Sequence, residues 1–454
     1  MSFDNVNDTI AAICTAPGGA LAILRLSGPD ALSILNTICR TKHKISREHA
    51  RKAILAHALR DDGETCLAIY MPGPASYTGE DVAEIQCHGG DFAPLRLLRA
   101  ALDAGARHAE GGEFTRRAFL NGKLDLTQAE AVADMIHAGS NAAMELAERQ
   151  MSGQLGRKLR LCRENILRVV SEIESRLDFT DEDLDWIPAD TLCNILNDTK
   201  ENLLHYLDTA NTGALIRNGI RLVIAGAPNA GKSSLLNALL GYDRAIVTPI
   251  PGATRDTLEE TLSIRGIALR ATDTAGLRST SDQVEQLGVE RTRKAVKSAD
   301  VVLWLLDSTE PEKAIAHFLA EKEDGFSGKV ILCWNKSDLT ANQTLPEIPG
   351  YPQVLSISAV TGEALDKLTS EIENAVWRSA GNHEDETAIS ERHAAMIRQA
   401  LPALDEAMGL IQNEMWELAA PGLHQAIHTL GTITGESADP DILDEIFSRF
   451  CIGK

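Results

Sequence analysis

The segment at residues 226–233 constrains the fold more than any other part of this chain. It reads Gly-Ala-Pro-Asn-Ala-Gly-Lys-Ser and directly follows the apolar run Leu222–Ala225. A loop of this spacing between a strand and a helix closes its backbone N–H groups around phosphates. Lys232 would then meet the β- and γ-phosphates, and the Ser233 hydroxyl would bind Mg²⁺. A glycine-rich turn followed by an unrelated lysine could have the same sequence. Residues further along the chain are therefore needed to identify a nucleotide site.

Three later segments, each at the end of an apolar run, indicate that the site binds a guanine nucleotide. Asp273-Thr274-Ala275-Gly276 supplies a carboxylate for the Mg²⁺ shell and a Gly N–H near the γ-phosphate. The run Asn335-Lys336-Ser337-Asp338 ends on a carboxylate that can accept two hydrogen bonds from guanine N1 and N2, which adenine cannot offer. Ser358-Ala359-Val360 fits a loop that supports the base. The ordered set is similar to the translation-factor-like branch of P-loop GTPases.

The sequence from Arg221 alternates short apolar runs with helical stretches, which is typical of a sheet built from βαβ units. The expected strands are Leu222–Ala225, Ile267–Ala271, Val301–Leu306, Val330–Trp334 and Val354–Ile357. This alternation stops near Trp377, and a polar, acidic linker follows at 381–387. We therefore expect a Ras-like GTPase domain at 218–380, inserted between two other segments.

The segments on either side differ in their periodicity. Residues 1–123 read as mixed, mostly strand-like structure, with alternation from Asp81 to His88. Helical spacing then begins at Leu155 and returns from about Glu391. We expect a multidomain α/β protein: an N-terminal α+β domain at 1–123, and a helical domain from two flanking segments, 124–217 and 381–454.

Composition bounds the function only loosely. The 454 residues carry a formal charge of −21, whereas a protein that grips RNA through its phosphates is normally basic. A nucleic-acid substrate would need a local basic patch or presentation by a partner. The eight cysteines form no Cys-x-x-Cys pair, and no apolar run is long enough to span a membrane. A cytoplasmic protein without membrane contact is the simplest expectation.

The catalytic machinery departs from that of Ras-type enzymes. The position after Asp-x-x-Gly, where a glutamine would orient the attacking water, is Leu277. Arg255 and Arg278 are candidates for an arginine finger, although such arginines are usually only solvated. Asn229 offers a neutral oxygen beside the phosphates, where a monovalent cation could sit.

Several segments outside the GTPase region carry a resemblance to one family. They are Pro-Ala-Ser-Tyr-Thr-Gly-Glu-Asp-Val-Ala-Glu-Ile-Gln-Cys-His-Gly-Gly at 74–90, Gly-Glu-Phe-Thr-Arg-Arg-Ala-Phe-Leu-Asn-Gly-Lys-Leu-Asp-Leu-Thr-Gln-Ala-Glu at 112–130, and the terminal Phe-Cys-Ile-Gly-Lys at 450–454. With the P-loop, these segments resemble the MnmE (TrmE) family of tRNA modification GTPases, in order and from end to end.

The resemblance implies a K⁺-dependent GTPase that acts with a flavoprotein partner, MnmG (GidA). The pair adds an aminomethyl or carboxymethylaminomethyl group to C5 of the tRNA wobble uridine. A tetrahydrofolate derivative (5-formyl or methylene) is the implied one-carbon source, and FAD belongs only to the partner. The N-terminal domain is implied to bind this folate and to form a homodimer.

The resemblance also implies roles for single residues. Asn229, Thr248, Ile250 and Ala253 would hold K⁺, Ser233 and Thr254 would hold Mg²⁺, and Glu285 would orient water indirectly. This chain has Ala253 where the family commonly has threonine, which matters only if that hydroxyl contacts K⁺. The complete predicted GTP-binding set is Asn229, Ala230, Gly231, Lys232, Ser233, Ser234, Thr248, Thr254, Asp273, Thr274, Ala275, Gly276, Asn335, Lys336, Asp338, Ser358, Ala359 and Val360.

For the folate, the resemblance implies Arg25, Glu84, Lys123 and Lys454. A pterin offers donors to a carboxylate such as Glu84, and the cations suit the glutamate tail and formyl oxygen. Arg25 is suggestive by itself because a charge inside an apolar run needs a partner. Cys451 could act as a nucleophile, or it could be a small buried cysteine. The predicted catalytic residues are Glu285, Lys232, Asn229 and Cys451.

Two other functions remain open from the sequence. A GTP-switched ribosome or RNA assembly factor would use hydrolysis only to time binding and release, but such proteins usually append a basic module. A GTPase-linked transporter would need transmembrane helices, and no run of sufficient length is present.

Overall fold

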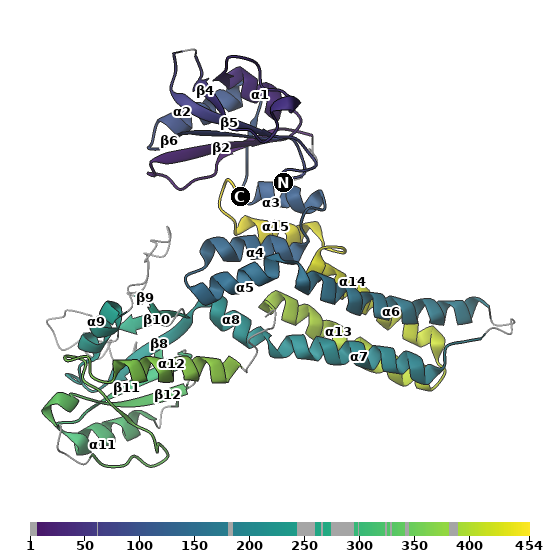
Figure 1. Ribbon diagram of the computed structural model, residues 1–454. Helices are drawn as coiled ribbons and strands as arrows, with labels where there is room; N and C mark the ends of the chain where they lie inside the picture. Colours follow the sequence, from purple (N-terminus) through teal and green to yellow (C-terminus); the bar gives the residue numbers. More distant parts are fainter. Residues whose placement is uncertain are drawn as a thin grey trace. The chain divides into compact units, whose positions relative to one another are not determined.

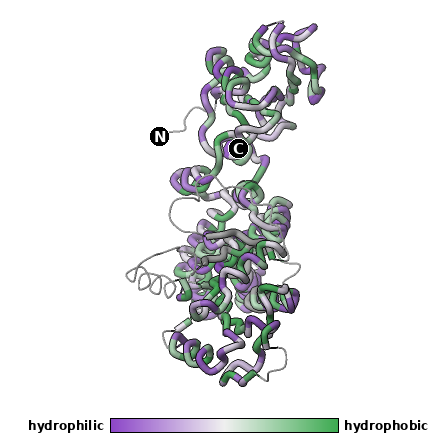
Figure 2. Tube along the Cα trace, turned by 90° about the vertical axis from the view of Figure 1, so that its left-hand side faces the viewer, coloured by the Kyte–Doolittle hydropathy of each residue, from purple (hydrophilic) through white to green (hydrophobic). Residues whose placement is uncertain are grey.

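The computed structural model of this chain describes 7–60, 62–179, 185–242, 259–264, 267–273, 295–297, 299–322, 325–326, 329–340, 345–380 and 389–454. These residues form two compact units, and each has hydrophobic cores of its own. The first unit contains 1–136, 149–200 and 396–454, and the second contains 137–148 and 201–395. Figure 2 shows hydrophobic and hydrophilic residues interleaved along the chain, and no helix of the described part is long and apolar enough to cross a membrane.

The N-terminal part of the first unit is a seven-stranded sheet in the order β3-β4-β5-β6-β2-β1-β7. Its strands are β1 (Ile10–Ile13), β2 (Leu21–Ser27), β3 (Cys39–Arg40), β4 (Ile54–Ala58), β5 (Thr65–Met71), β6 (Val82–His88) and β7 (Arg107–His108). Neighbouring strands are antiparallel except β1 and β7, which are parallel. A 3₁₀ turn, η1 (Arg47–His49), lies in the connection from β3 to β4.

Alternation along the strands decides which face of this sheet is buried. In β6, Ala83, Ile85 and Cys87 are buried, whereas Glu84 on the other face keeps part of its side chain exposed, as the sequence pattern predicts. The buried face packs under α1 (Ala31–Ile38) and α2 (Ala93–Asp103), whose apolar residues join the same core. The mostly strand-like pattern of 1–123 did not locate the three helices of this α+β domain, which are α1, α2 and α3 (Glu113–Leu120).

Helices from both flanks of the nucleotide region pack together in the first unit, as the fold-class prediction requires. From the first flank come α3 (Glu113–Leu120), α4 (Leu126–His137), α6 (Gln154–Asp178) and most of α7 (Ala189–Asp208), and from the second most of α13 (Glu391–Gln412), α14 (Trp416–Thr434) and α15 (Pro440–Ser448). Most of α5 (Asn141–Met151) belongs to the second unit. Figure 1 shows α6 beside α14, where the Arg176 guanidinium lies 4.2 Å from the Trp416 ring centroid. Lys200 of α7 pairs with Asp405 of α13 at 2.5 Å.

The second unit holds a six-stranded sheet in the order β13-β12-β11-β8-β10-β9. Its strands are β8 (Ile220–Gly226), β9 (Glu259–Ile264), β10 (Ile267–Asp273), β11 (Val301–Asp307), β12 (Lys329–Asn335) and β13 (Leu355–Ser356). All pairs are parallel except β9–β10. The five predicted strands are present, and β9 was not predicted.

Helices cover both faces of this sheet, and the buried residues of β11 divide between them. Leu303 and Leu305 share a core with α9 (Lys232–Tyr242) and α12 (Leu365–Ala380). Val302 and Trp304 share the opposite core with α11 (Pro311–Lys322). α8 (Ala210–Asn218) leads into β8. Because parallel strands end at one edge, the loops after β8, β10, β11, β12 and β13 gather there, where ligands bind in such sheets.

Candidate functional site

The loop between β8 and α9 has the conformation of a phosphate-binding loop. Gly226 ends β8 with φ 143°, Asn229 lies in the left-handed region at φ 63°, and Gly231 follows at φ 95°. Lys232 begins α9, so the N–H groups of its first turn point toward the loop. The Lys232 Nζ donates to the carbonyl oxygens of Gly226 and Ala227, both at 2.9 Å. The lysine therefore closes the loop and carries positive charge at the place where phosphates would bind.

Asn335 joins this loop to the loop after β13. Its Nδ2 donates to the Ala230 oxygen at 2.8 Å, and its Oδ1 accepts from the Ala359 nitrogen at 3.0 Å. A Cβ at position 231 would lie 2.2 Å from the same Nδ2. Gly231 is thus required both by its positive φ and by the close approach of Asn335.

The loops that would hold the base are fixed by polar contacts of their own. The buried Ser358 hydroxyl donates to Asp338 Oδ1 at 2.6 Å, which orients the carboxylate predicted to read guanine. Lys336 Nζ pairs with Asp307 Oδ2 at 2.6 Å. Burial alone would raise the pKa of Asp307, but hydrogen bonds from Lys336 and Thr309 outweigh it and lower the pKa.

Sequence reasoning missed Asp307, although its position gave a signal. It ends β11 directly opposite Asn335 in the parallel register, so it had to lie at the ligand edge. The other predicted residues of this edge lie where a ligand can reach them. Asn229, Ser233 and Ser234 are exposed, as is Val360, whereas Ala359 is buried beneath. The exposed Ser233 hydroxyl at the start of α9 fits a Mg²⁺ ligand, and such an ion would neutralise charge on the phosphates.

Most of the other residues predicted for the nucleotide site lie outside the described part of the chain, and Asp273 is the exception. β10 ends at Asp273 as predicted, which brings its backbone to the same edge of the sheet. The positions that lie outside the described residues are Thr248, Ile250, Ala253, Thr254, Arg255, Thr274, Ala275, Gly276, Leu277, Arg278 and Glu285.

A second cluster of the predicted residues lies on the N-terminal sheet. Arg25 of β2 faces Glu84 of β6 in the register, and its Nε donates to Glu84 Oε1 at 2.8 Å. Both side chains are mostly buried, with exposures of 19% and 16%. The Arg25 guanidinium lies 5.4 Å from the Tyr77 ring centroid and 5.6 Å from that of Phe114. Within the described residues, both Nη groups of Arg25 and Oε2 of Glu84 have no hydrogen-bond partner.

The end of the chain seats beside this pair. The Phe114 nitrogen donates to the Lys454 oxygen at 3.1 Å, and residue 111 forms a β-bridge with Ile452. Gly453, at φ 98°, is so close to β1 that an added Cβ would lie 2.6 Å from the Ile13 oxygen. Burial raises the pKa of the adjacent Cys14 thiol. The charges of Arg25, Glu84 and Lys454 also act on this thiol. The tail thus lies against Phe114 and close to Cys14, both of which also interact with Arg25.

Lys123 and Cys451 border this cluster without joining it directly. Lys123 is exposed, and its Nζ donates to the Pro74 oxygen at 3.1 Å, on the loop that carries Tyr77. Cys451 is exposed, so the alternative of a small buried cysteine is wrong. Sequence reasoning missed Tyr77 and Phe114, although both lie inside the segments that carry the family resemblance.

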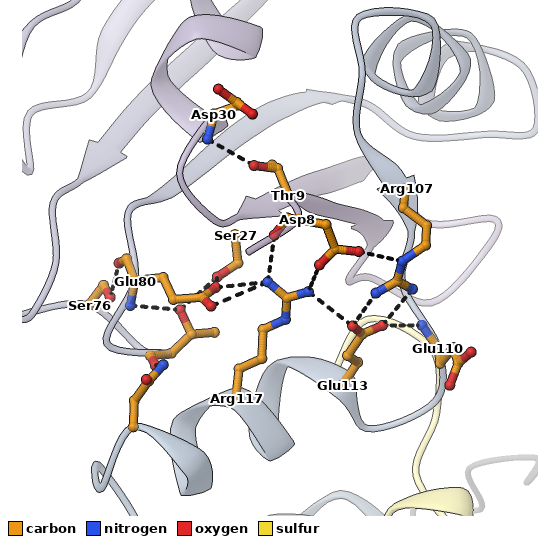
Figure 3. Close-up of polar contacts among 12 residues, drawn as sticks. Asp8, Thr9, Ser27, Asp30, Ser76, Glu80, Arg107, Glu110, Glu113 and Arg117 are labelled. Atoms are coloured by element: carbon orange, nitrogen blue, oxygen red, sulfur yellow. Dashed lines mark hydrogen bonds and ion pairs between the residues drawn. The ribbon is translucent and has the colours of Figure 1, made fainter. Parts of the chain in front are cut away.

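A buried ionic network holds α3 and the neighbouring loops in place (Figure 3). Arg117, only 5% exposed, contacts Asp8, Glu80 and Glu113. Arg107 of β7 pairs with Glu113 at 2.5 Å and with Asp8 at 2.6 Å. Three charged segments distant in sequence thereby fix α3, and with it the Phe114 ring beside Arg25.

The nucleotide loop, its bridging asparagine and the oriented Asp338 define the class of this protein: a P-loop protein that binds a guanine nucleotide on an α/β sheet. The model of the MnmE helical domain matches residues 126–451, and that of the GTP-binding protein TrmE N-terminus matches 9–123. The chain belongs to the MnmE (TrmE) family of tRNA modification GTPases.

Relatives named tRNA modification GTPase MnmE align along almost the full chain. The protein of Dichelobacter nodosus is 43% identical, covering 99% of this chain and 99% of the relative. That of Akkermansia muciniphila is 42% identical over 98% of this chain and 99% of its own. That of Clostridioides difficile (strain 630) is 39% identical over 99% and 100%. Membership of this family makes the chain a GTPase.

Proposed function

We propose that this GTPase modifies C5 of the wobble uridine of tRNA together with a flavoprotein partner of the MnmG (GidA) kind. The one-carbon unit would come from a tetrahydrofolate derivative bound at Arg25, Glu84, Lys123 and Lys454. GTP would bind with Mg²⁺ at the loop containing Ser233, and its hydrolysis would gate the modification. FAD would be held by the partner alone, and the pair would work in the cytoplasm.

The observation that carries the folate proposal is the unused hydrogen-bonding capacity of the Arg25–Glu84 pair. Within the described residues, both Nη groups of Arg25 and Oε2 of Glu84 lack a partner, and both side chains are mostly buried. These polar atoms are open to solvent and are not used by other described residues, so a ligand with adjacent donors and acceptors can pair with them. A pterin ring has such an edge, and Tyr77 provides an aromatic neighbour.

Equilibrium dialysis with 5-formyltetrahydrofolate tests this site. Glu84→Gln keeps the shape but replaces a charged acceptor, so we expect at least about tenfold weaker binding. Glu64→Gln is the matched control, because Glu64 pairs with exposed His88 on the same sheet and should bind folate normally. Equal folate affinity of the native chain and Glu84→Gln would refute the site.

We infer further that hydrolysis uses K⁺, held by Asn229 together with the backbone of Thr248, Ile250 and Ala253, with Thr254 on Mg²⁺ and Glu285 orienting water. A cation there would stabilise the negative charge of the transition state. Asn229 supports this role because it lies within the phosphate loop, is exposed and has a left-handed backbone conformation. GTP turnover should be faster in K⁺ than in Na⁺ at equal ionic strength, and Asn229→Ala should abolish the difference. Equal turnover of the native chain in both salts would contradict it.

We also infer that the N-terminal sheets of two chains pair. Leu55 and Leu67 face each other across β4 and β5, are 64% and 37% exposed, and share a sheet face with Arg25 and Glu84. A second copy covering this apolar row would also shield the folate. Light scattering should report a dimer for the native chain and a monomer for Leu55→Lys with Leu67→Lys, while a dimeric variant would exclude this face.

A further inference from the structure

The connection between β3 and β4 is strongly basic, although the chain as a whole is acidic. Residues 40–52 carry six Lys and Arg against the single acid Glu48, a net charge of +5 in a chain of −21. Two histidines, His43 and His49, lie in the same segment. A dense local run of cations is a usual footprint of a surface that binds nucleic-acid phosphates.

These cations are displayed to solvent and are not neutralised by the protein. All six are exposed: Arg40, Lys42, Lys44, Arg47, Arg51 and Lys52. Within the described residues, none of the six forms an ion pair with a carboxylate. Many other arginines of the same unit do, such as Arg116 with Asp444 at 2.8 Å and Arg160 with Asp125 at 2.6 Å. Unpaired surface cations are left with their full charge for an outside partner.

The backbone of the segment is fixed, so the cations project from a defined surface. Asn36 donates through Nδ2 to the Ile45 oxygen at 2.9 Å and accepts from the Ile45 nitrogen at 2.8 Å. The Ile45 side chain is 3% exposed and belongs to the N-terminal core. Ser46 and His49 form a capping box around η1. A preordered surface loses less conformational entropy on binding than a flexible one.

The segment is also tied to the loop that borders the folate cluster. Arg51 donates from Nη2 to the Ala75 oxygen, and its nitrogen donates to the Tyr70 oxygen at 2.7 Å. The preceding carbonyl, that of Pro74, accepts from Lys123. One short loop therefore links the basic segment to a predicted folate residue. An RNA backbone held by the cations would therefore be bound on the same domain as the Arg25–Glu84 cluster.

We propose that the basic segment 40–52 is the surface that grips the phosphate backbone of the tRNA beside the folate cluster. This inference rests on the proposed function for the identity of the RNA. The segment supplies the local basic patch that an acidic RNA-modifying chain needs, through phosphate contacts that position the RNA and do not read its sequence.

Fluorescence anisotropy with an unmodified tRNA transcript tests the proposal on the full-length protein. We expect Lys42→Gln with Lys44→Gln to weaken binding roughly tenfold at low salt. The slope of log affinity against log salt should fall by about 2, one for each lost phosphate contact. The matched control is Arg96→Gln with Arg99→Gln, which removes two exposed charges from α2 of the same domain and should leave both quantities unchanged. GTP turnover and 5-formyltetrahydrofolate binding should stay normal in both variants.

The outcomes separate this proposal from the proposed function. A native chain that binds tRNA through Lys42 and Lys44 but does not bind the folate would refute the folate chemistry and leave the surface standing. Equal tRNA affinity of the native chain and the Lys42/Lys44 variant would overturn the surface, as would an equal loss in the Arg96/Arg99 control. Unchanged tRNA binding with lost binding of the flavoprotein would instead make the segment a protein-docking surface, which also overturns it.

Discussion

Asn335 joins two loops of the nucleotide site through a single side-chain amide. Its Nδ2 holds the Ala230 oxygen, its Oδ1 holds the Ala359 nitrogen, and the residue is 2% exposed. Removing the amide leaves both backbone groups buried without their partner, which costs about 1–3 kcal/mol for each group.

Asn335→Ala should therefore weaken GDP binding strongly and lower the melting temperature of the second unit. We expect at least about a hundredfold loss of GDP affinity, measured by titration calorimetry, since two loops lose their alignment. Ser337→Ala, which removes only the hydrogen bond to Glu363 on the exposed side, is the control and should bind GDP almost normally. Near-native affinity of the alanine variant would show that the loops align without this amide.

Glu113 is expected to make stability depend on pH. Burial alone would raise its pKa, but hydrogen bonds from Arg107 and the Glu110 nitrogen, with Arg117 nearby, hold the pKa below the ordinary 4.5. The unfolded state then takes up the proton first, so the stabilisation is present above about pH 4.5 and is lost as the pH falls through the lowered folded value.

Urea unfolding at several pH values measures this effect. Glu113→Gln should lose about 3 kcal/mol of stability near pH 7, because it leaves the buried Arg117 and the exposed Arg107 without this carboxylate, and its stability should decline less steeply in acid than that of the native chain. The control Glu64→Gln breaks a more exposed pair and should follow the native profile. Identical acid profiles of the native chain and Glu113→Gln would contradict a role for this carboxylate.

For single residues, the sequence predicted site residues that belong to short motifs of fixed spacing. It missed residues whose contacts join segments far apart in the sequence. Lys232, Asp338 and Ser358 belong to runs of fixed spacing, so their meeting at one edge of the sheet could be expected. Asp8 and Arg117 are 109 positions apart, and their contact depends on how β1 and α3 dock. No periodicity in one sequence encodes that approach.

At the scale of elements, the C-terminal tail is a short segment with a large role. Gly453 has φ 98° and lies against Ile13 and Cys14 so closely that a methyl group would clash. The tail also holds the Lys454 backbone at Phe114, whose ring lies beside Arg25. Displacing the tail should therefore remove one side of the proposed folate site and leave the hydrophobic core of the domain intact.

Gly453→Ala should reduce 5-formyltetrahydrofolate affinity by about tenfold or more and leave GTP turnover in the same preparation unchanged. Gly18→Ala is the matched control: its φ is 79°, but no atom lies within 4 Å of the added methyl group. Both variants carry similar backbone strain of about 1 kcal/mol, so only the clash distinguishes them. Equal folate binding by the two variants would show that the tail does not shape the site.

Helices and strands with strong periodicity were predicted well, because burial of one face sets their pattern. α6 and the five strands of the nucleotide sheet lie where the apolar spacing placed them. The edge strand β9 was missed because Glu259 and Glu260 break its apolar pattern, and an edge strand needs little burial. α1, α2 and α3 were not located because their apolar residues lie among strand-like runs and turn residues.

At the scale of the whole molecule, net charge misleads about local surfaces. A total of −21 argues against RNA binding, yet residues 40–52 carry +5 on exposed side chains. The structure explains how a basic surface can exist on an acidic chain. Cations elsewhere, such as Arg163 beside Glu436, are neutralised by carboxylates of the same chain. Composition averages over this difference, so only the pairing of each charge can reveal it.

The division into two compact units with cores of their own predicts that each ligand stabilises only part of the molecule. A ligand at 100 times its Kd stabilises the unit that binds it by about 2.7 kcal/mol. For units of this size, that corresponds to a rise in melting temperature of roughly 5–10 °C. GDP should therefore raise one calorimetric transition, and 5-formyltetrahydrofolate should raise the other.

Differential scanning calorimetry of the full chain distinguishes independent from coupled units. Asn335→Ala should abolish the shift caused by GDP and keep the shift caused by folate, whereas Glu84→Gln should do the reverse. A single transition that both ligands raise together would mean that the units unfold as one cooperative body. In that case nucleotide and folate would stabilise each other's sites through the shared fold, and the loss of GTP-site order would be felt directly at the folate.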